Sequence, residues 1–163
     1  MRRIERTTVL SSEEETLALA ARLGGCLSGG EVIALVGDLG SGKTTFTRGL
    51  AMGLGLDDPR RVCSPTYVLE QIYPARLPVH HYDAYRLGSA EEFLALGFEE
   101  QRQQGAVLVI EWADKVERVV PRDALRIEFR LPSWERPMAR ELCISGPADP
   151  WEDRLSRILG AAR

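Results

Sequence analysis

The sequence has few cysteines, and they do not form a recognisable set. Cys26, Cys63 and Cys143 are far apart and odd in number, and no C-x-x-C pair occurs. Disulfide frameworks in small domains use even numbers of cysteines, and structural zinc sites use closely spaced ones. The sequence therefore predicts neither a disulfide scaffold nor a zinc site, and it fits a reducing cytoplasm.

Long hydrophobic runs are also missing. No stretch approaches the ~18 consecutive apolar residues of a membrane-spanning helix, and no apolar signal segment follows the basic start MRRIER. The 163 residues are 44% hydrophobic and 28% charged, with a net charge of −3, which is typical of a folded water-soluble domain. We expect one cytoplasmic domain over residues 1–163, with neither a membrane nor DNA as a partner.

Lysine is rare in this chain. Lys43 and Lys115 are the only lysines among the 21 basic residues, so arginine supplies nearly all of the positive charge. GC-rich coding is the simplest explanation of the bias. Lys43 nevertheless stands in the stretch GDLGSGKT, a position that calls for a compact ammonium group on a thin stem.

Apolar residues recur with the periods of both strands and helices. Strand patterns cover residues 3–10, 31–37, 66–73, 77–85, 106–112, 123–131 and 140–145. Helical patterns cover residues 11–27, 44–56, 90–98 and 150–162. The runs 31–37 and 106–112 are apolar throughout, as in buried parallel strands, whereas 66–73 and 77–85 indicate an antiparallel hairpin. Together these patterns predict an α/β domain with a mixed parallel and antiparallel sheet.

Capping residues set the predicted helix boundaries. Ser11 is the expected N-cap of the first helix, with Glu14 at the capping-box position. The apolar face of this helix is expected to comprise Leu17, Ala20, Ala21 and Leu27. Ser89 is expected to cap the helix over 90–98, and Pro150 to take the first helical position of the last helix.

The stretch GDLGSGKT, residues 37–44, matches the P-loop pattern G-x-x-x-x-G-K-[ST] between a predicted buried strand and a predicted helix. The glycines allow conformations in which successive backbone N–H groups point inward at an anion. Lys43 is expected to bridge the β- and γ-phosphates, Thr44 to bind Mg²⁺ and Thr45 to reach the α-phosphate. The predicted fold is therefore a P-loop NTPase-like three-layer domain, with nucleotide contacts at Asp38, Leu39, Gly40, Ser41, Gly42, Lys43, Thr44 and Thr45.

Polar residues stand at strand ends near the P-loop, where ligands of α/β sheets bind. Glu111 ends a predicted buried strand. Burying a carboxylate costs free energy unless a cation or a hydrogen-bond donor contacts it. Asp83 ends the second hairpin strand, and Thr66 lies where the hairpin begins. We expect Glu111 to bind Mg²⁺ with Thr44, Asp83 to act in or beside the metal's ligand shell, and Thr66 to reach the metal or the γ-phosphate. The residues alone leave open which acid ligates the metal and which orients the attacking water.

Neighbouring aromatic residues and histidines give weaker signals. His80 and His81 are adjacent, so they point to opposite faces of a strand and cannot ligate one metal together. Both are expected to have packing or surface roles. Trp112 follows Glu111 and is either a core residue or one that stacks on the ligand.

The residues are compatible with more than one class of P-loop protein. The order of loop, hairpin and aspartate is that of a small GTPase, but AYR follows Asp83 and no [NT]-K-x-D motif occurs, so guanine specificity is disfavoured. A free-standing small-molecule kinase would need an arginine-rich lid that is not evident. A nucleotide-dependent switch that binds partners with little turnover is a further alternative.

The segments GDLGSGKTTFTRGL, SPTYVL, HHYDAYRL and IEWADK resemble, in order and spacing, the bacterial TsaE (YjeE) family. The P-loop is shared by many families, but SPTY followed by H-x-D-x-YRL and IEW is specific. The resemblance extends from near Ser11 to near Ser145 and leaves the expected final helix, 149–163, outside it. Tyr67 stands where many members have Phe.

The resemblance implies an ATPase of tRNA N6-threonylcarbamoyladenosine biosynthesis with ATP and Mg²⁺ as cofactors. In that family the TsaD protein, together with TsaB, transfers the threonylcarbamoyl group, and ATP hydrolysis by the TsaE-like subunit supports turnover. These two proteins are the implied partners, and tRNA is reached through their complex.

The resemblance also assigns roles by motif. Lys43 and Thr44 form the Walker A pair, and Thr66 belongs to a switch-like loop. Asp83 is the Walker-B-like acid, and Glu111 and Trp112 form an EW pair, with Mg²⁺ placed against the equivalents of Thr44 and Glu111. Adenine contacts are implied near Leu10 and Ser12.

Overall fold

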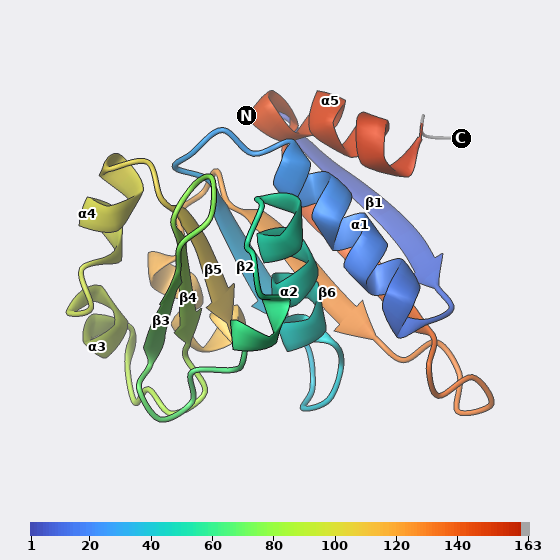
Figure 1. Ribbon diagram of the computed structural model, residues 1–163, viewed down its shortest axis with the longest axis horizontal. Helices are drawn as coiled ribbons and strands as arrows, with labels where there is room; N and C mark the ends of the chain where they lie inside the picture. The colour runs from blue at the N-terminus through green and yellow to red at the C-terminus, as the bar shows by residue number, and fades with distance from the viewer. Residues whose placement is uncertain (161–163) are drawn as a thin grey trace.

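A computed structural model describes residues 1–160 and contains one seven-stranded sheet (Figure 1). The strands are β1 (Arg3–Leu10), β2 (Val32–Val36), β3 (Glu70–Tyr73), β4 (Val79–Asp83), β5 (Val107–Glu111), β6 (Leu125–Arg130) and β7 (Arg140–Pro147). Their spatial order is β1-β7-β6-β2-β5-β4-β3. The four central strands β6, β2, β5 and β4 are parallel, and the strands at both edges pair antiparallel. The predicted mixed sheet is confirmed.

Helices cover both faces of this sheet. They are α1 (Glu13–Gly25), α2 (Lys43–Gly53), α3 (Ala90–Leu94), α4 (Phe98–Gln103) and α5 (Ala148–Leu159), with short 3₁₀ segments η1 (Pro59–Arg61) and η2 (Ala113–Val119). One buried cluster joins α1, α2 and α5 to one face, and a second joins α3, α4 and η2 to the other. Figure 1 shows α1 and α2 lying across the front of the sheet. The predicted three-layer α/β arrangement is therefore confirmed.

The apolar run in β2 follows from its central position. Ile33 and Leu35 belong to the cluster under α1 and α2, whereas Val32 and Ala34 belong to the cluster on the opposite face. A parallel strand covered on both faces has no side that must be polar. The P-loop therefore follows directly on a strand whose first four residues are buried and whose last, Val36, is half-buried.

The predicted start of α1 is wrong by one residue. Ser12, in an extended conformation, is the N-cap, and its hydroxyl accepts a hydrogen bond from the backbone N–H of Glu15 at 3.2 Å. The Glu15 carboxylate accepts in turn from the backbone N–H of Ser11 at 2.6 Å. The buried residues of α1 include Leu19, Ala20 and Leu23, of which the expected apolar face contained only Ala20. Leu17 and Ala21 are half-buried.

The segment expected to form one helix over 90–98 is interrupted. Ser89 is the N-cap of α3 as predicted, its hydroxyl accepting from the N–H of Glu92. Gly97 then takes a left-handed conformation, with φ of 75°, and a separate helix, α4, begins after it. Two short helices replace one because this glycine turns the chain.

The remaining strand and helix boundaries differ less from those that the sequence predicted. The hairpin of β3 and β4 is confirmed, but residues 66–69 form a turn instead of extending β3, with the N–H of Leu69 bonded to the carbonyl of Pro65 at 2.7 Å. Helix α5 forms as expected, although the backbone at Asp149 is extended. The part of the predicted last helix at 161–162 lies outside the described residues.

Within residues 1–160, no helix is long and apolar enough to cross a membrane.

Glycines allow α1 and α2 to pack with their backbones close together. A Cβ atom at Gly53 would lie 2.1 Å from the carbonyl oxygen of Ala21, and one at Gly49 would lie 2.6 Å from that of Leu17. From the other side, a Cβ at Gly24 would lie 2.3 Å from the Leu50 oxygen. Because neighbouring backbone cannot yield easily, these positions fix where α2 lies.

We predict that Gly53→Ala destabilises the protein, although alanine favours helices by ~1 kcal/mol. Forcing the two helices apart should lower the free energy of unfolding by about 1–3 kcal/mol, measured by urea denaturation. Gly25→Ala is the matched control, because a Cβ there meets nothing within 4 Å. The packing account would be contradicted if both variants were equally stable.

Candidate functional site

The P-loop connects β2 to α2 and offers its backbone N–H groups to a ligand. Gly40 and Gly42 have φ values of 76° and 108°, which strongly favour glycine. Gly42 is the N-cap of α2 and supplies no side-chain cap, so the first N–H groups of the helix are not capped by that residue. A glycine-rich loop at a helix N-terminus is a binding site for phosphate groups.

Arg140 of β7 supports the loop from outside. Its guanidinium donates to the carbonyl oxygen of Ser41 at 2.9 Å and to that of Gly40 at 3.2 Å. In a trans peptide the carbonyl and the following N–H point in opposite directions. Because Arg140 binds the Ser41 carbonyl, the N–H of Gly42 points away from the Arg140 guanidinium.

Lys43 is buried beneath the loop, with 5% of its surface exposed. Its ammonium donates to the carbonyl oxygens of Gly37 at 2.6 Å and Asp38 at 2.9 Å, and it lies 4.2 Å from the centre of the Trp112 ring. Burial lowers the pKa of this ammonium, and the Glu111 carboxylate opposes the shift. Trp112 adopts a φ of 58°, an uncommon conformation for a bulky residue.

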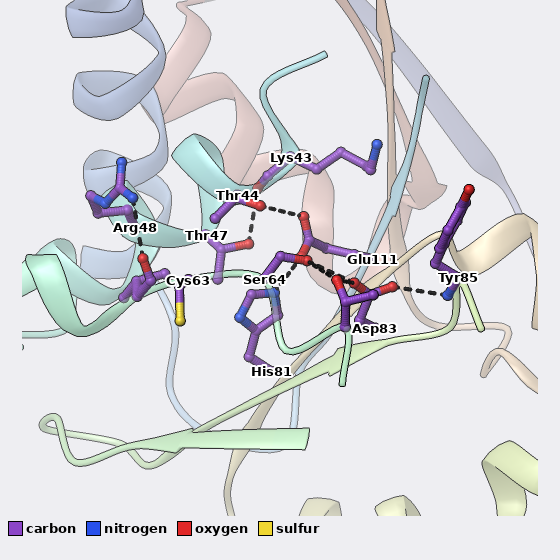
Figure 2. Close-up of polar contacts among 12 residues, drawn as sticks. Lys43, Thr44, Thr47, Arg48, Cys63, Ser64, His81, Asp83, Tyr85 and Glu111 are labelled. Carbon is purple, nitrogen blue, oxygen red and sulfur yellow. Dashed lines mark hydrogen bonds and ion pairs between the residues drawn. The ribbon is translucent and has the colours of Figure 1, made fainter. Parts of the chain in front are cut away.

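Thr44 and Glu111, which the sequence analysis expects on one metal ion, lie in direct contact (Figure 2). The Thr44 hydroxyl, from the first turn of α2, donates to Glu111 Oε1 at 2.9 Å at the end of β5. Glu111 is 2% exposed. Burial alone would raise its pKa, but hydrogen bonds from His81 and Thr44 outweigh burial, so the pKa lies below its usual range. The site therefore contains an ionised, buried carboxylate beside a hydroxyl.

His81 contacts this carboxylate, a contact that the expectation of packing or surface roles for the two histidines did not include. Its Nε2 lies 2.8 Å from Glu111 Oε2, and its Nδ1 lies 2.9 Å from the Tyr73 hydroxyl. His80 points to the other face of β4, where its Nδ1 lies 2.7 Å from Glu70. The two imidazoles thus lie on opposite faces of β4 and cannot ligate one metal together, but each has a carboxylate partner of its own.

Asp83 lies beside Glu111, since the two residues are direct partners in the β4–β5 register. Its Oδ2 accepts from the hydroxyls of Ser64 at 2.7 Å and Thr66 at 3.0 Å, and its Oδ1 accepts from the N–H of Tyr85 at 2.8 Å. Asp83 thus ties the loop before β3 to the end of β4.

Two adjoining cavities open at the P-loop. The smaller, of about 360 Å³, is lined by Lys43, Thr44, Thr45, Thr66, Asp83 and Glu111, among others. The larger, of about 710 Å³, lies between the P-loop and the segment joining β6 to β7, and its lining includes Asp38 and Trp134. The remaining predicted contacts Leu39, Gly40, Ser41 and Trp112 line both, and Gly42 lines the smaller one.

Leu10 and Ser12 line neither of these cavities. Leu10 is 8% exposed and packs in the core, and the Ser12 hydroxyl caps α1. The structure instead places the segment between β6 and β7 beside the P-loop, with Phe129 and Arg140 in the larger cavity. The contribution of Leu10 and Ser12 to nucleotide binding stays a prediction.

Sequence reasoning missed residues whose partners are distant in the chain. Arg140 gave no signal because the P-loop lies about 100 positions away. Ser64 stands within the quoted SPTY segment, and His81 could have been found from strand alternation, which places it on the same face of β4 as Asp83.

The donor set at the smaller cavity fits a magnesium–nucleotide complex. Mg²⁺ in such sites commonly binds one or two carboxylates together with substrate phosphates and waters. Glu111 supplies an ionised carboxylate, and Thr44 supplies a hydroxyl next to the phosphate-binding loop. Among residues 1–160 no three His, Cys, Asp or Glu side chains form a metal-binding group of their own.

Comparisons with known proteins agree with these features. A family model described as "Threonylcarbamoyl adenosine biosynthesis protein TsaE" matches residues 10–140. The "tRNA threonylcarbamoyladenosine biosynthesis protein TsaE" of Bacillus subtilis is 38% identical over 131 residues, covering 80% of this chain and 79% of the relative. The protein of the same name from Treponema pallidum is 37% identical over 123 residues, covering 76% and 90%.

A similar solved structure is the crystal structure of Bacillus subtilis YdiB. It superposes with a TM-score of 0.77 at 28% sequence identity, covering 98% of this chain and 97% of that one. The likeness thus extends through α5, beyond the residues that the family model matches.

We predict that Asp83→Ala loosens the loop at residues 62–66. The Ser64 and Thr66 hydroxyls would lose a shared acceptor, and losing hydrogen bonds of about 1 kcal/mol each should speed amide hydrogen exchange roughly tenfold. Hydrogen exchange followed by mass spectrometry measures this directly. Asp114→Ala, at an exposed acid near the P-loop, is the control, and equal exchange in the two variants would contradict the assignment.

Proposed function

The chain belongs to the TsaE family, and from this membership and the geometry of its site we propose that it is the Mg²⁺-dependent ATPase of tRNA threonylcarbamoyladenosine biosynthesis. The observation that carries the chemical part is the contact of Thr44 with the buried Glu111 carboxylate directly beside a P-loop. The family and its relatives carry the part that concerns the pathway.

The P-loop residues of this chain would hold the triphosphate. The N–H groups of Gly40 and of residues 42–45 would surround an anion, because Gly40 and Gly42 are left-handed and Arg140 binds the carbonyls of Gly40 and Ser41. The N–H of Ser41 instead donates to the carbonyl oxygen of Asp38 at 3.1 Å. Lys43 already lies beneath the loop, and its ammonium would exchange loop carbonyls for phosphate oxygens. A side chain desolvated in this way attracts phosphate more strongly than an exposed lysine would.

The two acids would then have separate roles. Glu111, next to Thr44, would face the metal, which when bound neutralises charge on the phosphate oxygens. Asp83 is engaged by Ser64 and Thr66 at the same cavity, so it would hold that loop and orient a water molecule. The two acids also differ in their hydrogen-bond donors. Glu111 accepts from Thr44 of α2 and His81 of β4, whereas Asp83 accepts from the loop before β3.

The larger cavity would receive the nucleoside. It continues from the P-loop toward Phe129 and Trp134, and Trp134 is 90% exposed. Aromatic faces of this kind stack on a base. ATP is proposed over GTP because the sequence carries no [NT]-K-x-D motif.

The TsaD and TsaB proteins are the proposed partners, with tRNA reached through them. Leu39 and Trp134 line the two cavities and are 87% and 90% exposed, and Tyr67, which follows the lining residue Thr66, is 85% exposed. Apolar groups gathered at a surface favour protein contact. A partner covering these cavities would exclude water from the site and so stimulate hydrolysis.

We predict that Lys43→Ala lowers ATP hydrolysis by roughly 100-fold, the loss typical when one donor to developing charge is removed. Phosphate release by the purified chain with Mg²⁺ measures the rate. Arg22→Ala, which removes an exposed cation from α1, should retain the wild-type rate. Unchanged hydrolysis and Mg·ATP affinity in the Lys43 variant would disprove the phosphate site.

Glu111→Gln separates an ATPase from a nucleotide-dependent switch. As an ATPase subunit the variant should lose multiple-turnover tRNA modification, with hydrolysis reduced about 100-fold. As a switch it would hydrolyse slowly and still support modification. Glu70→Gln is the matched control, because its carboxylate also bonds a buried histidine but lies outside the site.

Partner dependence tests the pathway assignment. We expect Mg²⁺-dependent ATP hydrolysis to rise when TsaB, TsaD and tRNA of the same organism are added to the purified chain. Measurement with each component omitted identifies the one that stimulates. ATP binding without any response to the partners would leave the P-loop assignment intact and overturn the pathway assignment.

A further inference from the structure

His81 is a fully buried imidazole with a polar partner on each ring nitrogen. Its side chain has no exposed surface, and that of Glu111 is 3% exposed. Nε2 faces Glu111 Oε2 at 2.8 Å, and Nδ1 faces the Tyr73 hydroxyl at 2.9 Å. With the carboxylate oxygen as the acceptor, Nε2 is the donor in the contact with Glu111.

The Glu111 carboxylate is held at both oxygens by different elements. Thr44 of α2 donates to Oε1, and His81 of β4 donates to Oε2. A carboxylate fixed at one oxygen by a donor inside the protein presents its other oxygen in one direction. Here that direction is the Thr44 hydroxyl at the start of the P-loop helix (Figure 2).

We propose that His81 is a positioning residue for the metal site, orienting Glu111 through Nε2 so that Oε1 faces the magnesium side of the cavity. The inference rests on the proposed function, because it assumes that Glu111 meets the metal. Groups that hydrogen-bond a metal-binding side chain from behind typically change metal affinity or activity by about 10–100-fold when removed.

The same imidazole connects Glu111 to the loop before β3. The Tyr73 hydroxyl lies 2.9 Å from His81 Nδ1 and 3.1 Å from the carbonyl oxygen of Cys63, and its single proton is donated to one of them at a time. Cys63 directly precedes Ser64, whose hydroxyl binds Asp83. The chain of contacts from Cys63 through Tyr73 and His81 thus sets the position of Glu111 relative to this loop.

The two nitrogens can be tested separately by substitution. The side-chain nitrogen of Gln reaches about as far from the backbone as Nε2, and that of Asn about as far as Nδ1. His81→Gln therefore keeps a donor near Glu111, whereas His81→Asn removes it and keeps a polar group near Tyr73. His80→Asn is the matched control, because His80 is also buried and bound to a carboxylate, on the opposite face.

The experiment measures binding of a non-hydrolysable ATP analogue to the full chain as Mg²⁺ is titrated, and again with the metal chelated. His81→Asn is expected to raise the half-saturating Mg²⁺ concentration about tenfold while leaving metal-free affinity for the analogue unchanged. His81→Gln should restore the value to within about threefold of wild type, and His80→Asn should not change it. A purely structural role would lower both affinities together and would not be rescued by Gln.

Equal Mg²⁺ dependence in wild type and His81→Asn, or equal losses in Asn and Gln, would overturn the inference. If His81→Asn does not fold, Tyr73→Phe decides, because it leaves the imidazole in place and removes only the hydroxyl that contacts Nδ1 and the Cys63 carbonyl. This variant should raise the half-saturating Mg²⁺ concentration about threefold, and no change would count against the inference.

Failure of the proposed function gives a different result. If Glu111→Gln and wild type bound the analogue with the same Mg²⁺ dependence, the metal site itself would be wrong, whatever His81 does. If Glu111→Gln lost the metal dependence and His81→Asn did not, the metal site would stand and only the role of His81 would be refuted.

Discussion

The buried carboxylate of Glu111 is the group on which the rest of the site depends. Removing such a charge from water costs several kcal/mol unless hydrogen bonds or an opposite charge compensate. Thr44 and His81 provide this compensation, one at each carboxylate oxygen, and the pKa of Glu111 remains below its usual range. The hydrogen bonds that stabilise the ionised carboxylate therefore come from α2 and β4. The orientation of the Glu111 side chain depends on where these two elements lie.

The fold supplies that placement. The parallel neighbours β2, β5 and β4 end at one edge of the sheet, which brings the P-loop, Glu111 and Asp83 together. Helix α2 is fixed by backbone contact with α1 at Gly49 and Gly53, so the position of Thr44 at its first turn is determined by packing far from the site. The packing of this helix pair therefore also sets the position of Thr44 relative to Glu111.

The sequence predicted the features that arise from local pattern. The apolar run of β2, the P-loop and the strand ending at Glu111 follow from residue type and spacing, and the α/β class with a mixed sheet follows from their order. The resemblance to the TsaE family was also correct, as the family model shows. These elements could be predicted from local patterns because a central strand is buried on both faces, so nearly all of its residues must be apolar.

The features that the sequence did not predict depend on tertiary contacts or on backbone conformation. His81 and Arg140 act on residues 30 and about 100 positions away, which no pattern of spacing along one element can reveal. The start of α1 depends on which of two adjacent serines is extended, and the break between α3 and α4 depends on the left-handed Gly97. The surrounding tertiary structure selects these backbone conformations, so the local sequence alone does not determine them.

A crystal structure of the chain with Mg²⁺ and a non-hydrolysable ATP analogue tests the central claim most directly. The account predicts the triphosphate across residues 40–45 and the metal about 2.1 Å from the Thr44 hydroxyl oxygen, with Glu111 Oε1 facing the metal and His81 still bound to Oε2. A triphosphate bound elsewhere, or a metal distant from both Thr44 and Glu111, would contradict it.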